Sequence, residues 1–383
     1  MVRFAFLVLW ALPAFAQEPA LSPAGWDSLR VLGEQQMEAG SFEAAAETFT
    51  RLVEAEPKDA EARTRLGYAH LKAKHYEEAE KAFKASKKLD KTRVEAYVGL
   101  GLTYAEGPAK GLEALYHFRK AVGEGKRAIK LDPEFALAYR LLGELYVRFR
   151  EDHEKAIGYY TQYLERVSDD PESLYPFGLA CVQAGQYDKI ERHLMPYLKA
   201  HPEEVRLLPL AAQGYFFLER YEVALEHFER YLQHLDEAKG ALYTDISLVA
   251  SKKELQAYDA LSDEGERQAY LGRFWKRRDP DILTGINERI IEHYRRVWHA
   301  RTFFSKHVQP WDRRGEVYIR YGEPDHRARS VERHVQISPE VEAVRTRMAV
   351  DMYGPEATYL TFVGPVFPVK VHRDPYSVSV AFK

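Results

Sequence analysis

Apolar and small residues recur along the first part of the chain at the spacing of paired amphipathic helices. In residues 26–59, Leu32 and Gly33 precede a break, and Ala45 and Phe49 follow it at helical spacing. Small side chains such as Gly33 and Ala45 allow two helices to cross closely. Pro57 ends the second helix because it cannot donate a backbone hydrogen bond. The pattern therefore predicts two antiparallel helices in this unit.

The same pattern returns five more times. Units begin at residues 60, 94, 136, 171 and 205, and the last ends at residue 236. The third unit is eight residues longer than the 34-residue period and contains Gly123 and Gly125, which predicts a longer or interrupted second helix. One helical hairpin cannot bury its apolar face alone, whereas stacked hairpins share a continuous core. A mainly α fold, an α-α superhelix over residues 26–236, follows.

The arrangement resembles the tetratricopeptide repeat (TPR), and the resemblance covers residues 26–236. It implies a scaffold whose first helices line a concave groove that binds other proteins or peptides. A packing or solvated role is the alternative for each single groove position, so the surface as a whole is the firmer prediction. The groove positions carried over from the family are Arg30, Tyr68, Lys72, Arg140, Arg148, Tyr175 and Phe216.

The N-terminus has the features of a secretory signal peptide. Arg3 precedes an apolar run over residues 4–16, and the small residues Ala14 and Ala16 flank Phe15 before Gln17. We expect cleavage after residue 16, a linker over residues 17–25, and export to the periplasm or out of the cell. No cysteine stands directly after the apolar run, which disfavours a lipid anchor. No later stretch is long and apolar enough to span a bilayer, so we expect no transmembrane segment in the mature chain.

Charge and cysteine content narrow the class of protein. The formal net charge of -3 gives no basic excess of the kind that nucleic-acid binding needs, so we expect no nucleic-acid partner. Cys181 is the single cysteine, and it therefore cannot form an internal disulfide. Its position in a repeat predicts a small buried side chain.

After residue 236 the repeat pattern stops and further helices are expected. Residues 237–261 are interpreted as a connecting helical segment. Ser262 is then expected as the N-cap of a helix that runs to about residue 277, where Asp279-Pro280 breaks it. Thr284 is expected to cap the next helix. Its apolar stripe consists of Ile286, Ile290, Tyr294, Val297 and Phe304.

The pattern near the C-terminus favours strands. Val317, Ile319 and Tyr321 alternate with polar residues, which predicts a strand before a turn at residues 322–325. A short helix is expected from residue 338, and two short strands over residues 359–371. Together these elements predict a small α+β domain after the superhelix.

Residues 262–327 resemble the GWxTD domain, a bacterial family often found after helical repeats. The chain departs from the namesake motif at residues 309–315, where Trp311 is kept without the preceding Gly or the following Thr-Asp. The resemblance implies a GWxTD-like domain over residues 262–330 with an α+β extension over residues 331–383, and it implies no particular activity. The residues that carry it include Phe274, Trp275, Arg278, Asp279, Pro280, Asn287, Glu288, Glu292, Arg296, Trp311, Gly315, Gly322 and Pro324.

Charged residues in this half allow several kinds of chemistry. Residues 271–350 hold 17 Lys and Arg against 11 Asp and Glu, which indicates either a salt-bridged surface or peripheral contact with an anionic envelope surface. His293 and His299 are too few for a metal site, which needs three or four ligands. No phosphate loop, nucleophile elbow or dinucleotide fingerprint is present, so we expect no cofactor.

Three functions remain open at this point. The first is an exported adaptor that holds partner proteins in the groove. The second is an enzyme with its catalytic site in the C-terminal domain, which a polar cleft around Trp275, Asp279, Glu288 and Arg296 would favour. Glu292 and Asn287 could join such an acid/base group. In the third, the C-terminal helices cap the exposed end of the solenoid.

Overall fold

The computed structural model describes residues 23–323 except 282, 284 and 307, together with residues 340, 343, 344, 346, 347 and 350. The chain divides into two compact units, Met1–Gly322 and Glu323–Lys383. The fold described below is that of the first unit. The expected signal peptide and the two strands expected over residues 359–371 lie outside the described residues.

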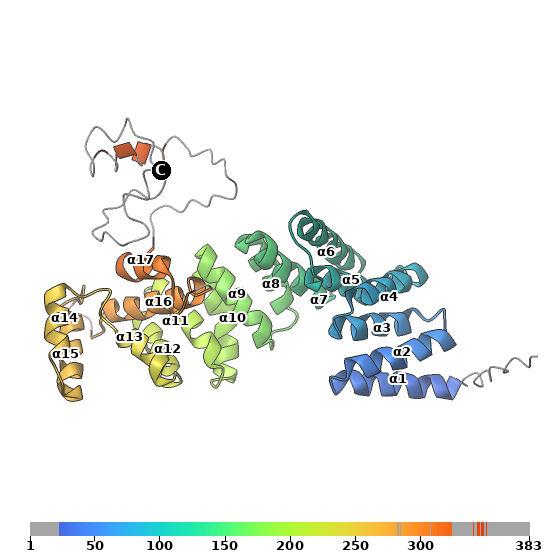
Figure 1. Cartoon of the computed structure of the whole chain (residues 1–383), viewed down its shortest axis with the longest axis horizontal. Helices are drawn as coiled ribbons and strands as arrows, with labels where there is room; N and C mark the ends of the chain where they lie inside the picture. Colours follow the sequence, from blue (N-terminus) through green and yellow to red (C-terminus); the bar gives the residue numbers. More distant parts are fainter. Residues whose placement is uncertain are drawn as a thin grey trace, which may run out of the picture. The chain divides into compact units, whose positions relative to one another are not determined.

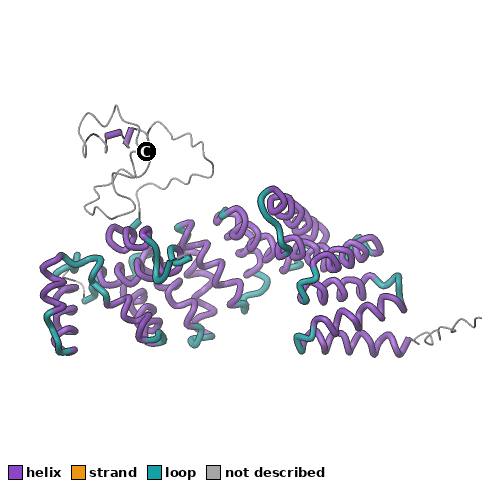
Figure 2. The backbone as a smooth tube through the Cα atoms, in the orientation of Figure 1, coloured by secondary structure: helices purple, strands orange, loops and turns teal. Residues whose placement is uncertain are grey.

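Six helical hairpins follow one another in the first unit (Figures 1 and 2), and the prediction of a mainly helical, TPR-like superhelix is confirmed. The second helix of the third hairpin is the longest, and the first helix of the fourth ends in the π-helical turn η1. The hairpins are α1 (Pro23–Glu38) with α2 (Phe42–Ala55), α3 (Ala60–Lys72) with α4 (Tyr76–Leu89), α5 (Val94–Glu106) with α6 (Leu112–Leu131), α7 (Ala136–Leu145) and η1 (Tyr146–Arg150) with α8 (His153–Leu164), α9 (Pro171–Ala184) with α10 (Tyr187–Ala200), and η2 (Val205–Leu207) and α11 (Leu208–Phe217) with α12 (Tyr221–Gln233).

The small residues of the repeat lie where the two helices of a hairpin cross. A Cβ placed on Gly33 would come within 2.6 Å of the Phe49 ring, and one on Gly67 within 2.7 Å of the Phe83 ring. Ala45, the reciprocal small position in α2, is fully buried. These contacts explain why the sequence pattern located the crossing points, since a larger side chain would push the helices apart.

The eight additional residues of the third unit lengthen α6 without interrupting it. Gly123 faces open space, whereas Gly125 is buried and a Cβ on it would lie 3.0 Å from Leu142 Cδ2 in the next hairpin. Only Gly125 therefore serves close packing between units.

The first helices of successive hairpins pack on one another: α3 with α5, α5 with α7, and α9 with α11. A stack of hairpins whose first helices lie close together curves towards those helices. The first helices therefore line the concave face of the stack, as the resemblance implied.

The connecting segment over residues 237–261 contains two short helices instead of one, α13 (Glu237–Thr244) and α14 (Lys252–Asp259). The helix expected to run to about residue 277 is present as α15 (Glu264–Lys276). The N-cap of α15 is Asp263, whose carboxylate accepts a hydrogen bond from the Glu266 amide at 2.9 Å. The expectation that Ser262 holds this position was wrong by one residue, because the longer acidic side chain next to it reaches the free amides and complements the helix dipole.

Helix α16 (Glu288–Phe303) covers the open end of the last hairpin, because it packs on α11, α12 and α13. Its buried Ile291, Val297 and Trp298 belong to the same apolar core as Phe228 of α12. In α11 the buried Gln213 side chain donates to the Arg295 carbonyl at 3.1 Å. The C-terminal helices thus continue the solenoid core and cap its end. This arrangement agrees with the hypothesis that these helices act as a structural cap.

Residues 317–321 form a helix, so the predicted strand was wrong. Helix α17 (Arg313–Tyr321) packs on α16 and buries Gly315, Tyr318 and Ile319, which recur at helical spacing. Val317 and Tyr321, which were expected to share the buried face of a strand, are 54% and 75% exposed. Their alternation has no packing role, and the packing of α17 on α16 decides the local structure. No strand occurs in the described residues, so the α+β character of the C-terminal domain is not shown.

No helix in the described part of the chain combines the length and apolar character needed to cross a membrane.

Candidate functional site

The first helices form a surface with a cavity near its N-terminal end. This cavity, of about 420 Å³, lies between α1 and α3. Arg65 crosses it, with Nε 3.0 Å from a Glu34 carboxylate oxygen and Nη2 3.9 Å from Glu61. The apolar side chain of Val31 is 57% exposed beside it. Charged and apolar groups are therefore both presented to solvent there.

Two of the predicted groove arginines are held in ion pairs within the repeats. Arg30 donates to Asp59 at 2.7 Å and to Asp27 at 3.0 Å, and it also pairs with Glu56. These contacts join the middle of α1 to the turn between α2 and α3. Arg140 donates to Glu144 at 2.9 Å and lies 3.5 Å from Asp170. Both side chains therefore contribute to the packing of neighbouring hairpins.

The predicted aromatic positions are partly covered. The Tyr68 hydroxyl donates to the Glu95 carbonyl at 3.0 Å, its ring meets Phe83 edge-on, and burial raises the pKa of Tyr68. Tyr175 is half-buried against the core. Phe216 lies under the guanidinium of Arg295, with 5.1 Å from Cζ to the ring centroid. Helix α16 thus occupies the surface at Phe216.

The remaining two predicted positions, Lys72 and Arg148, are exposed and share one register position with two residues that the sequence reasoning missed. Glu38, Lys72 and Glu106 are the last residues of α1, α3 and α5 and lie 34 residues apart. Each of these three residues follows the glycine of its repeat by five positions, and so does Arg148. All four side chains are exposed, and together they are called the concave row below. The repeat period itself was the signal that could have found Glu38 and Glu106.

Glu106 lies within the electrostatic reach of its neighbours along this row. Desolvation raises the pKa of Glu106, and the negative charge of Glu144 raises it further. The positive charges of Lys72 and Arg148 lower it. Arg148 Nη1 also donates to the Ala105 carbonyl at 3.1 Å, which places the guanidinium at the end of α5. Lys72, Glu106 and Arg148, from three successive first helices, are therefore close in space.

Several residues that carry the GWxTD resemblance have structural roles. Asn287 is the N-cap of α16: its Oδ1 accepts from the amides of Arg289 and Ile290 at 3.0 and 3.3 Å. Its Nδ2 donates to the Trp275 carbonyl at 2.7 Å. This second bond ties the start of α16 to α15 and explains why the helix begins here and is not capped at Thr284, as was expected.

Arg278 and Phe274 hold α15 against α14. Phe274 is fully buried, and the guanidinium of Arg278 stacks on its ring at 3.7 Å. Arg278 Nη2 also donates to both Glu254 carboxylate oxygens at 2.8 and 2.9 Å. Glu254 in turn completes a capping box with Ser251, and these hydrogen bonds lower the pKa of Glu254 to about 2.

Arg296 binds the end of α17. Its Nη1 donates to the carbonyls of Ile319 and Arg320, both at 3.2 Å, and its Nη2 pairs with Glu292. Gly322 follows at φ +85°. The guanidinium thus satisfies carbonyls that the helix end leaves free, and its positive charge complements the helix dipole.

The remaining motif residues are dispersed. The Trp311 side chain packs over Gly315, where a Cβ would lie 2.6 Å from Trp311 Cβ. Pro280 is exposed, and Glu288 has a buried carboxylate oxygen. Pro324 lies outside the described residues. Many arginines of this half are in ion pairs, among them Arg289, Arg313 and Arg314.

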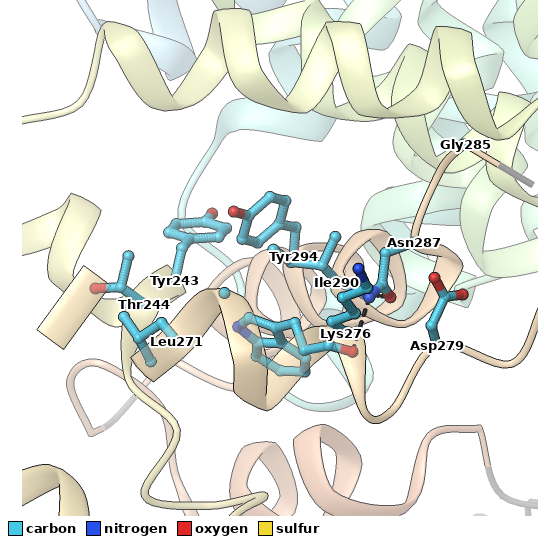
Figure 3. A pocket seen from close by; sticks show the side chains of 11 residues that line it. Tyr243, Thr244, Leu271, Lys276, Asp279, Gly285, Asn287, Ile290 and Tyr294 are labelled. Carbon is cyan, nitrogen blue, oxygen red and sulfur yellow. Dashed lines mark hydrogen bonds between the residues drawn. The ribbon is translucent and has the colours of Figure 1, made fainter. Parts of the chain in front are cut away.

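A second cavity, of about 550 Å³, lies between α13, α15 and α16 (Figure 3). The aromatic residues in its lining are Tyr243, Trp275 and Tyr294. Asp279 lines the end near Asn287. The enzyme hypothesis placed Trp275, Asp279, Glu288 and Arg296 in one cleft. Trp275 and Asp279 do line this cavity. Glu288 and Arg296 do not line it. The structure therefore does not bring that acid/base group together.

His293 and His299 are both buried in the core of α16. The His293 ring lies 4.8 Å from Trp275, and burial lowers the pKa of His293 to about 4. The His299 ring stacks on Tyr318 at 4.1 Å. Among the described residues, no three His, Cys, Asp or Glu side chains are grouped to hold a metal ion.

Comparison with protein families matches residues 30–93 and 109–171 to a tetratricopeptide repeat model. With the hairpin geometry above, this shows that the chain contains tetratricopeptide repeats, and this fold suggests protein or peptide partners. No curated protein matches the chain. The GWxTD resemblance rests on the sequence alone.

The solved structures to which the chain is similar are distant in sequence. YrrB, described as a TPR protein with an unusual peptide-binding site, is 21% identical, with a TM-score of 0.42 over 52% of this chain and 97% of YrrB. TTC0263, a thermophilic TPR protein of Thermus thermophilus, is 20% identical, with a TM-score of 0.42 over 52% of this chain and 99% of TTC0263. A tetratricopeptide repeat protein of Parabacteroides merdae is 16% identical, with a TM-score of 0.40. The match covers 70% of this chain and 96% of that protein.

Proposed function

We propose that this protein is an exported adaptor that holds a partner protein on the concave face of its tetratricopeptide repeats. The observation that carries the proposal is the row of exposed charges on the first helices, Glu38, Lys72, Glu106 and Arg148. In the described residues none of these four is in an ion pair, whereas nearby Arg30, Arg65 and Arg140 are. Exposed charges at one register of a repeat surface are available to a ligand.

The C-terminal helices complete this adaptor as its cap. Trp298 and Val297 of α16 share a core with Phe228 of α12, so this part of the chain protects the last hairpin from solvent. The GWxTD-like residues Asn287, Arg278 and Arg296 then serve to fix α15, α16 and α17 on one another. The capping role fits a scaffold without requiring a reaction in this domain.

Export is the part of the proposal that rests on sequence alone. The run over residues 4–16, the basic Arg3 and the small residues Ala14 and Ala16 support cleavage before Gln17. We place the mature protein in the periplasm or outside the cell, where its partner would also be.

The test is an affinity capture from envelope fractions, with the chain from Gln17 as bait. One variant, Lys72→Glu/Arg148→Glu, changes two bases on the concave row. The matched control, Lys81→Glu/Lys88→Glu, makes the same charge change at exposed positions of the second helix α4. We expect the first variant to lose the partner and the control to keep it. Equal capture by both would place the binding site elsewhere.

A further inference from the structure

The charges along the concave row alternate in sign. From α1 to η1 they are Glu38, Lys72, Glu106 and Arg148, and the next residue at this register is the uncharged Gln183 of α9. Within the row, Glu106 has a base on either side, Lys72 and Arg148, while Glu144 and Lys74 also lie near it outside the row. The row thus presents a fixed order of charge, acid, base, acid, base, over four successive first helices.

The spacing of this row restricts the conformation of a ligand that follows it. Helix α3 packs on α5 and α5 on α7, and packed helices lie about 8–10 Å apart, so Lys72, Glu106 and Arg148 are separated by roughly that distance. A polyproline II chain has three residues per turn and rises 3.1 Å per residue, so every third side chain points the same way at about 9.3 Å spacing. A β-strand turns every third side chain to the opposite face. In an α-helix, two turns advance about 10.8 Å, and that mismatch grows along the row.

We propose that the groove recognises a polyproline II segment that carries alternating basic and acidic side chains at every third residue. This inference rests on the proposed function and specifies its ligand. Bases of the segment face Glu38 and Glu106, and acids face Lys72 and Arg148. Because the row contains two charges of each sign, recognition depends on their order and not on net charge.

The probes are synthetic peptides of similar composition. The first alternates Lys and Glu at every third residue over four charged positions, with Pro, Ala and Gln between them. The second groups the charges as Lys, Lys, Glu, Glu at every third residue, and a third reverses that order. A fourth, Ala-rich peptide alternates Lys and Glu at every seventh residue, so that it fits only as a helix. Affinities are measured by fluorescence anisotropy at low and high NaCl with the full chain from Gln17.

The variant Lys72→Glu/Glu106→Lys changes the row to acid, acid, base, base at constant net charge. The control Lys88→Glu/Glu47→Lys makes the same exchange at exposed positions of the second helices α4 and α2. We expect the natural chain and the control variant to bind the alternating peptide about tenfold more tightly than the grouped peptides. The reason is that the alternating peptide forms two more exposed ion pairs with the row. The row variant is expected to prefer one of the two grouped peptides instead. High salt should weaken each preference.

Such a switch shows that the variant is folded and that the order of charge selects the ligand. Equal affinities for all peptides, tighter binding of the helical peptide, no binding at all, or no switch in the row variant would overturn the proposal. If the envelope capture still depends on Lys72 and Arg148 in that case, the groove function stands and only the charge pattern fails.

Discussion

Arg296 and Gly322 are in direct contact at the end of α17. A Cβ on Gly322 would lie 2.5 Å from Arg296 Nη2, and the backbone there has φ +85°, which side chains other than glycine rarely adopt. The same guanidinium binds two carbonyls of α17. The C-terminal cap of the solenoid therefore requires glycine at position 322.

We expect Gly322→Ala to destabilise the protein by about 2 kcal/mol, because it adds backbone strain and displaces the guanidinium. The matched control is Gly123→Ala in α6, where a Cβ meets nothing within 4 Å. That change should stabilise the helix by about 1 kcal/mol, since alanine is the better helix former. Urea unfolding of both variants measures the two effects. If Gly322→Ala were as stable as the natural chain, the described contact would be wrong.

The buried imidazole of His293 makes stability depend on pH. Burial lowers its pKa from 6.5 to about 4, so the folded state favours the neutral ring. Its stabilising contribution is complete above pH 6.5, where the unfolded chain is also neutral, and is lost as the pH falls to about 4. The loss amounts to roughly 3 kcal/mol at 1.36 kcal/mol per pKa unit.

The measurement compares the urea unfolding of the natural chain and of His293→Phe at pH 7.5, 5.5 and 4. The phenylalanine keeps an aromatic ring against Trp275 but cannot bind a proton. We expect the natural chain to lose more stability than the variant across this range. Parallel pH profiles would contradict the assignment of this pH dependence to His293.

Cys181 is expected to be unreactive in the native protein. It is fully buried in α9, as its repeat position predicted, and burial raises the pKa of its thiol. Thiolate is the reactive form, so both access and ionisation are suppressed. A thiol reagent should label it only after urea unfolding. Labelling of the folded protein at the rate of a free cysteine would show that α9 is open to solvent.

The exported form is expected to begin at Gln17. Expression of the full chain in a bacterial host with fractionation and intact-mass measurement tests this expectation. The predicted mature species starts at Gln17 and occurs in the periplasm or medium, whereas Ala16→Pro, which disrupts the cleavage position, keeps the precursor. A cytoplasmic protein that retains residues 1–16 would contradict export.

The repeats could be predicted from sequence because each packing constraint recurs. Gly33 against Phe49 and Gly67 against Phe83 use the same pair of positions, so the period reports the fold directly. The helix start at Asn287 could not be found in this way. It depends on a bond to the Trp275 carbonyl, which only the packed structure brings near.

The same limit explains the errors in the C-terminal half. Val317, Ile319 and Tyr321 alternate, but α17 buries Tyr318 and Ile319 because α16 offers a helical contact surface. Among the groove positions, family equivalence predicted Lys72 and Arg148, which are exposed, but it could not show that Arg30 and Arg140 are held in ion pairs. Phe216 was expected in an open groove, and it is covered because α16 returns to pack on α11.

Binding of a partner on the first helices is best tested by site-specific photo-crosslinking in the envelope. A photoreactive residue replaces Glu38, Lys72 or Glu106 on the row, or Glu47 or Lys88 at exposed positions of the second helices. We expect one crosslinked partner at all three row positions and none at the two others. Crosslinks at Glu47 and Lys88 without any at the row would contradict it.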